Sequence, residues 1–201
     1  LMFRYGGNAF DAAIATQLAL AVVYPRAGNL GGGGFMVAHL KDNISFTFDF
    51  RETAPEATHS NIYVDTLTGK ADTSRSLNGP SSAGVPGTVA ALFATLPYAK
   101  LPFDSLIAPA IRLAKNGFCI TVLEAKKLNE HQAIFIRNNK MPILFVKNNA
   151  WKEGDTLRQV DLANTLLRIK EKGAAGFYEG ETAKLIVDEM KRGGGYISEK
   201  D

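Results

Sequence analysis

The sequence has few of the features that mark disulfide-bonded, membrane-spanning or nucleic-acid-binding proteins. It contains one cysteine, Cys119, so no internal disulfide can form, and the flanking Phe118 and Ile120 predict a buried thiol. No apolar run reaches the roughly 20 residues that a membrane span needs. The 23 basic and 20 acidic residues are interspersed, which argues against a basic face for nucleic acid.

Motifs for metal binding and for a nucleophilic serine are also absent. His39, His59 and His131 do not have the spacing of a zinc site, so we expect no metal and no cofactor. There is no Gly-x-Ser-x-Gly elbow, and abundance alone cannot single out a serine or threonine nucleophile. We therefore identify no catalytic residue from motifs within the chain.

What the sequence does contain is a glycine run, Gly28-Asn-Leu-Gly-Gly-Gly-Gly-Phe35. Consecutive glycines are costly in backbone entropy, so they indicate positive φ angles or a close approach of other atoms to the main chain. Gly31, Gly32, Gly33 and Gly34 either meet a ligand or form a tight corner between packed layers. A phosphate-binding loop requires a strand, then glycines, then a helix, whereas a helix precedes these glycines and a strand follows them.

Two predicted strands, 35–40 and 44–50, flank a short polar connection and form a hairpin. In the second strand Phe46 and Phe48 lie on one face and Thr47 and Asp49 on the other, so one side belongs to the core. Arg51 follows at the strand end. It either forms an ordinary ion pair with Asp49 or Glu52, or offers its guanidinium as a bidentate receptor for a carboxylate.

The rest of the chain is mainly helical, with a long Thr-, Ser-, Asn-, Gly- and Pro-rich surface segment at 53–86 that contains a weak strand at 61–64. Helices are predicted at 8–23, 89–96, 104–116, 121–136, 161–172 and 181–192. The first is apolar on nearly every face, which predicts a helix buried all round. Asp104 is expected to cap the helix at 104–116, and Thr121 the helix at 121–136. In the latter helix, Leu128, Ala133 and Ile136 are expected to share one face.

These elements predict an α+β fold, with residues 1–201 as a single partial domain. Two strands do not make a stable sheet, so partner strands are expected outside these residues. Both ends of the sequence are expected to lie within a longer chain. The lack of a secretory signal is therefore weak evidence on whether the protein is secreted.

Five motifs in this order resemble the γ-glutamyltransferase (γ-glutamyltranspeptidase) family over essentially the whole chain. They are Gly6-Gly-Asn-Ala-x-Asp-Ala-Ala13, Gly28-Asn-Leu-Gly-Gly-Gly-Gly-Phe35, Asp49-Phe-Arg-Glu-Thr-Ala-Pro55, Gly84-Val-Pro-Gly-Thr-Val89 and Gly176-Phe-Tyr-x-Gly180. The resemblance implies part of an N-terminal-nucleophile hydrolase with an αββα sandwich, made as a zymogen that cleaves itself into a large and a small subunit.

The resemblance further implies an enzyme that attacks γ-glutamyl amides such as glutathione with the N-terminal threonine of its small subunit, then transfers the γ-glutamyl group to water or to an amino-acid or peptide acceptor. Arg51 would bind the α-carboxylate of that group. Gly31 to Gly34 and Glu52 would form a supporting loop, and no catalytic residue would lie in 1–201. The implied partner is the small subunit, and the implied location is periplasmic or secreted.

Three other interpretations stay open at this stage. Relatives of the same fold include glutaryl-type (cephalosporin) acylases and poly-γ-glutamate hydrolases. A different class would be a non-catalytic member that keeps this region as a binding module. A small-molecule phosphate-binding domain would need the glycines to open a helix, and the strand after Gly34 argues against it.

Overall fold

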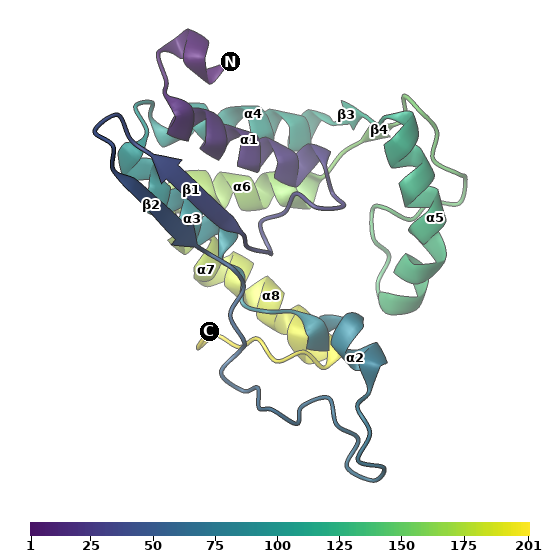
Figure 1. The fold of residues 1–201 in the computed structure, drawn as a ribbon. Coiled ribbons are helices and arrows are strands. Elements are labelled where there is room, and N and C mark those ends of the chain that lie inside the picture. Colours follow the sequence, from purple (N-terminus) through teal and green to yellow (C-terminus); the bar gives the residue numbers. More distant parts are fainter.

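The computed structural model describes residues 1–201 as a helical body that carries a β-hairpin, which confirms the α+β prediction (Figure 1). None of its helices is both long and apolar enough to cross a membrane. The helices are α1 (Ala9–Val23), α2 (Thr73–Leu77), α3 (Thr88–Thr95), α4 (Phe103–Asn116), α5 (Val122–Asn138), α6 (Val160–Lys172), α7 (Ala175–Tyr178) and α8 (Gly180–Gly193). The strands are β1 (Phe35–His39), β2 (Ser45–Asp49), β3 (Phe118–Cys119) and β4 (Thr156–Leu157).

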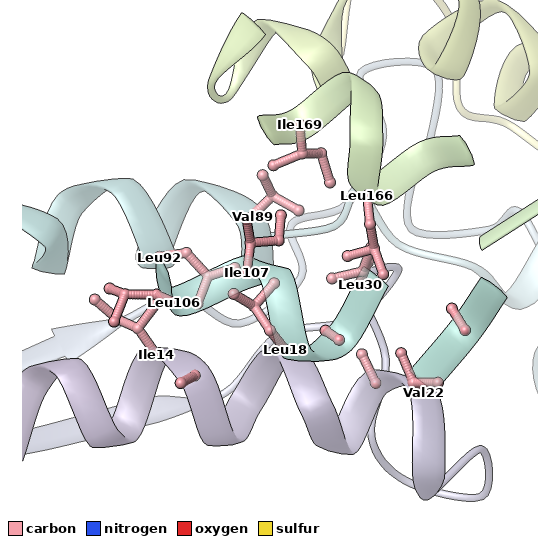
Figure 2. Packing of buried hydrophobic residues seen from close by; sticks show 14 of the residues in the cluster. Ile14, Leu18, Val22, Leu30, Val89, Leu92, Leu106, Ile107, Leu166 and Ile169 are labelled. Atoms are coloured by element: carbon pink, nitrogen blue, oxygen red, sulfur yellow. The ribbon is translucent and has the colours of Figure 1, made fainter. Parts of the chain in front are cut away.

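The core lies between α1, α4 and α6. Their fully buried side chains converge between the three helices in Figure 2. They include Ile14 and Leu18 from α1, Leu106 and Ile107 from α4, and Leu166 from α6. A core of branched aliphatic side chains fixes the mutual positions of three helices that are far apart in the sequence.

Helix α1 begins as its sequence predicts but is not buried all round. The Asn8 side chain accepts hydrogen bonds from the backbone N–H groups of Phe10 (2.8 Å) and Asp11 (3.2 Å), and Asp11 accepts from the N–H of Asn8 (2.6 Å), which completes a capping box. Ala13 and Thr16 are exposed. The prediction of complete burial was wrong for these residues because the packed elements cover only one side of the helix.

Asp11 also ties α1 to the segment before α4. Its fully buried carboxylate accepts hydrogen bonds from the backbone N–H groups of Lys100 (3.1 Å) and Leu101 (2.8 Å). Burial alone would raise the pKa of Asp11, but the backbone donors of Asn8, Leu101 and Lys100 outweigh it and leave the pKa below its ordinary value. Asp11 is therefore a charged structural group.

The hairpin pairs Phe35 with Asp49 and His39 with Ser45, and its connection contains Asn43 at φ 58°. As predicted from the alternation, Phe46 faces the body, where its ring lies 5.0 Å from that of Tyr98. The opposite face, which includes Val37, is exposed. The hairpin is thereby held to the body through one face.

Two details of the helix predictions were wrong. Asp104 does not cap α4; Pro102 occupies the N-cap position, and the Asp104 carboxylate lies in the first turn, 3.2 Å from the Lys170 ammonium. Thr121 does cap α5, but Ala133 and Ile136 are exposed. Ala125 and Leu128 are the residues of α5 buried in the local hydrophobic cluster, because residues three and four positions apart share a helix face.

The segment 53–86 contains more structure than was predicted. Val64 and Ala71 form an isolated β-bridge at the end of the predicted weak strand, and the short helix α2 follows. Asp72 caps α2 by accepting hydrogen bonds from Ser74 and Arg75. A five-residue helix gives too little periodicity to be detected from its sequence.

Residues 118–157, with α5 at their centre, form an arm beside the helical body (Figure 1). Near the end of α5 the arm contacts other segments through hydrogen bonds from Asn138 to the Asn78 side chain (3.3 Å) and from Lys140 to the Arg192 carbonyl (2.9 Å). The arm has its own small cluster, in which Trp151 is buried and donates its indole N–H to the Phe145 carbonyl (2.8 Å). Cys119 is exposed, so the prediction of a buried thiol was wrong. Side chains alternate along the strand, and Ile120 is the buried neighbour.

Candidate functional site

Arg51 comes immediately after β2, where the chain leaves the hairpin. The Asp49 carboxylate accepts a hydrogen bond from the backbone N–H of Arg51 (3.0 Å). This is an Asx-type turn, in which an aspartate side chain fixes the direction of the backbone two residues later. Asp49 therefore positions the Arg51 main chain and does not neutralise its side chain.

The Arg51 guanidinium is exposed and is absent from all seven ion pairs of the structure. The ion-pair interpretation with Asp49 or Glu52 is therefore not supported. The guanidinium carbon lies 5.9 Å from the ring centroid of Phe35. A cation over an aromatic face at this distance is weakly attracted and keeps its hydrogen-bond donors free for an anion.

Phe35 was not singled out from the sequence, although the pattern contained a signal for it. It is the first residue of β1 and pairs across the hairpin with Asp49. Residues paired across an antiparallel ladder point to the same face, and alternation places Arg51 on the Asp49 face. Phe35 could therefore have been predicted beside Arg51.

The glycine run forms a corner against the backbone that carries Arg51. None of its four consecutive glycines has a positive φ. A Cβ on Gly33 would overlap the Phe50 carbonyl oxygen and lie 2.7 Å from the Arg51 Cα, so this position needs glycine because of close packing. Around Gly31, in contrast, a Cβ would meet nothing within 4 Å.

A second pair of glycines approaches the same backbone from the turn that precedes α3. A Cβ on Gly87 would overlap the Phe50 carbonyl group, and a Cβ on Gly84 would lie 2.8 Å from the Glu52 Cβ. The backbone N–H groups of Gly87 and Thr88 both donate to the Gly32 carbonyl (2.8 and 2.9 Å). Segments 28–35 and 84–89 thus enclose the backbone of residues 50–52.

The predicted site residues are therefore partly brought together. Gly33 and Gly34 lie against the Phe50–Arg51 segment, and Gly32 joins this corner to the α3 turn. Gly31 lies outside the contact. Glu52 is exposed and lines a cavity of about 560 Å³ together with Thr53, Tyr63 and Gly84.

The chemistry offered by this arrangement is recognition of an anion. Arg51 presents a planar fork of N–H donors on an open surface, held by a backbone that is packed from two sides. No group of three or more His, Cys, Asp or Glu side chains is placed to hold a metal ion. A guanidinium with free donors can pair with a carboxylate or another anion.

Comparison with known proteins gives consistent matches over the whole chain. The family model described as Gamma-glutamyltranspeptidase matches residues 1–201. The glutathione hydrolase proenzyme of Escherichia coli (strain K12) is 38% identical over all of this chain, which covers 35% of that relative. The chain thus spans about a third of the length of this curated relative.

Solved structures of related proteins also match all or nearly all of the chain. The crystal structure of Helicobacter pylori gamma-glutamyltranspeptidase matches with a TM-score of 0.95 and 44% identity, covering all of this chain and 58% of that one. A cephalosporin acylase from Bacillus halodurans matches less well, at 27% identity and a TM-score of 0.85, covering 99% of this chain and 38% of that one.

Proposed function

The chain belongs to the γ-glutamyltranspeptidase family, an N-terminal-nucleophile hydrolase family, and from this we propose that residues 1–201 form the large-subunit side of a γ-glutamyl-binding site. The whole enzyme would cleave glutathione and related γ-glutamyl amides. It would pass the γ-glutamyl group to water or to an amino-acid or peptide acceptor. The name of the E. coli relative, a glutathione hydrolase proenzyme, supports both the substrate and the processing of a precursor.

The observation that carries this proposal is the unpaired guanidinium of Arg51 at the end of β2. A guanidinium pairs with a carboxylate through two parallel hydrogen bonds, which fixes orientation as well as position. Binding the α-carboxylate in this way places the γ-amide at a defined distance from Arg51. Such positioning of the scissile bond is a large part of catalysis.

The bond-breaking step belongs to residues outside 1–201. We propose that the hydroxyl of a threonine made N-terminal by cleavage of the precursor attacks the γ-carbonyl. Its α-amine takes up the hydroxyl proton and passes it to the departing amine, so that the amide C–N bond breaks and an ester acyl-enzyme remains. Water or an acceptor amine then releases the γ-glutamyl group. Arg51 supplies the binding half of this site and the small subunit supplies the chemistry.

Substitution of Arg51 in the full-length, processed enzyme tests the proposal. We expect Arg51→Ala to raise KM for γ-glutamyl p-nitroanilide by about 10- to 100-fold, since a hydrogen bond to a charged group contributes roughly 1.5–3 kcal/mol. Arg51→Lys should also raise KM, because an ammonium keeps the charge but loses the fork.

Arg112→Ala is the matched control, because Arg112 is exposed on α4 and forms none of the ion pairs. Its KM should equal that of the unsubstituted enzyme. Unchanged kinetics for Arg51→Ala would refute the assignment of the carboxylate site.

A glutaryl amide is the main competing substrate. A glutaryl group keeps the carboxylate that Arg51 would bind and lacks only the α-amine, so residues 1–201 do not discriminate between the two. The higher identity to γ-glutamyltranspeptidases favours glutathione over the acylase reaction. Assays of glutathione and a glutaryl amide with the same enzyme decide between them.

For location we propose a periplasmic or secreted protein, on the basis of the family resemblance. Cell fractionation of the native producer, followed by immunodetection, would test this. Recovery of the protein only from the cytoplasm would contradict it.

A further inference from the structure

The Tyr178 hydroxyl links α7 to residues 84–88, the turn that packs against the backbone of Arg51. Tyr178 ends α7 and is half-buried. Its hydroxyl donates a hydrogen bond to the Pro86 carbonyl (2.8 Å) and accepts one from the backbone N–H of Ala90 (3.1 Å). Pro86 and Ala90 flank the N-terminus of α3.

Tyr178 supplies a cap that the helix cannot provide for itself. The N-cap residue of α3 is Gly87, which has no side chain to accept a hydrogen bond from the first turn. Glycine is required there because a Cβ would overlap the carbonyl of Phe50. The close approach of α3 to the Arg51 segment thus removes the usual capping side chain, and Tyr178, 88 residues after Ala90, replaces it.

Residues 85–87, which precede α3, pack directly against the backbone around Arg51. Gly87 donates its N–H to the Gly32 carbonyl, and Val85 and Thr53 exchange backbone hydrogen bonds (2.8 and 3.3 Å). The Arg51 carbonyl oxygen lies 3.2 Å from where a Gly87 Cβ would be. A displacement of residues 85–87 is therefore transmitted to both sides of Arg51.

The environment of the Tyr178 hydroxyl allows it to donate one hydrogen bond and accept another. Burial raises the pKa of its hydroxyl, and the hydrogen bond from Ala90 offsets only part of that effect. The group therefore stays protonated around neutral pH and can donate and accept at once. The neighbouring Phe177 ring packs edge-on at 5.1 Å.

We propose that Tyr178 is a positioning residue for substrate binding, whose hydroxyl holds the Pro86–Thr88 turn against the backbone of Arg51. This inference rests on the proposed function. Tyr178 does not itself touch the substrate. Its loss should weaken recognition of the α-carboxylate and leave the threonine chemistry in place.

The test is the kinetics of Tyr178→Phe in the full-length, processed enzyme with γ-glutamyl p-nitroanilide. The change removes one oxygen atom and leaves the Pro86 carbonyl and the Ala90 N–H without their partner. We expect KM to rise by about 3- to 10-fold, as expected for the loss of roughly 1 kcal/mol of hydrogen bonding. KM is suited to this measurement because it does not depend on the fraction of active enzyme.

A double variant separates positioning from a general structural role. If Tyr178 acts through Arg51, adding Tyr178→Phe to Arg51→Ala should raise KM by no more than about twofold, because the interaction it supports has already gone. Tyr196→Phe is the matched control. It also removes a hydrogen-bonded hydroxyl, which accepts from Arg75 (2.8 Å), and its KM should not change.

Three results would overturn the inference. These are an unchanged KM in Tyr178→Phe, an equal rise in KM in the Arg51→Ala background, and failure of Tyr178→Phe to give processed enzyme. If Arg51→Ala itself leaves KM unchanged, the proposed function fails first. If Arg51→Ala raises KM and Tyr178→Phe does not, only the role of Tyr178 is wrong.

Discussion

Gly31 and Gly33 lie two positions apart in one glycine run, but the structure gives them different surroundings. A Cβ on Gly33 would collide with the backbone of Phe50 and Arg51, whereas a Cβ on Gly31 would meet no atom within 4 Å. The sequence shows four equivalent glycines. Only the fold shows that Gly33 is part of the support of Arg51.

This difference yields a prediction at the residue scale. Gly33→Ala should destabilise the full-length protein by about 1–3 kcal/mol, the usual cost of inserting atoms into packed structure, and should raise KM for a γ-glutamyl anilide. Gly31→Ala should leave both unchanged. Thermal unfolding and steady-state kinetics of the two variants measure these effects. Equal changes in stability and KM for the two variants would show that close packing at Gly33 is not what makes glycine necessary there.

At the scale of elements, the arm around α5 is stabilised separately from the helical body. Its cluster contains Ile120, Leu128 and Leu157 with Trp151, and the body has its own core. The arm's polar links to the rest of the chain are the ion pair of Arg26 with Glu124 (3.2 Å) and hydrogen bonds from Asn138 to Asn78 and from Lys140 to the Arg192 carbonyl. Regions with separate cores can open separately.

We therefore predict a local effect for Trp151→Ala. The lost burial should cost about 3–5 kcal/mol, and most of that cost should fall on the arm. Hydrogen exchange should become faster for amides of α5 and stay nearly unchanged for α1, α4 and α6. Leu166→Ala, in the body core, is the comparison and should increase exchange in those helices. Uniform faster exchange in Trp151→Ala would show that the arm and the body unfold together.

The whole molecule depends on a buried charge as well as on its apolar core. Asp11 completes the capping box of α1 and accepts hydrogen bonds from the segment before α4, so it fixes the relative position of two core helices. Its pKa is lowered in the folded protein. A carboxyl with a lowered pKa contributes stability above its unfolded pKa, and that stability is lost as pH falls through the folded value.

Asp11→Asn should therefore lower the Tm of the full-length protein at pH 7, with a cost of about 2 kcal/mol, because both carboxylate oxygens accept backbone hydrogen bonds and an asparagine amide keeps only one acceptor oxygen. The difference from the unsubstituted protein should shrink as pH falls below about 4, the ordinary pKa of an unfolded aspartate, and on through the lower pKa of Asp11 in the folded protein. Thermal unfolding of both proteins between pH 3 and 7 measures this. A difference that stays constant with pH would contradict the role of the charge.

The sequence by itself determined much of the local structure and pointed to one candidate site residue. Asn8 followed by Asp11 specifies a capping box, alternation sets the two faces of the hairpin, and the Asp49 to Pro55 motif points to Arg51. These features depend on neighbours within a few residues, so they can be read from the order of the amino acids.

The tertiary structure decided everything that depends on contacts between distant segments. It showed that Gly33 and Gly87 are needed for close packing, and that Cys119 faces outward. It also showed that the first turn of α3 is capped by a tyrosine 88 residues after Ala90. Packing and hydrogen bonding act through space, and a pattern along the chain does not record which distant residues will meet.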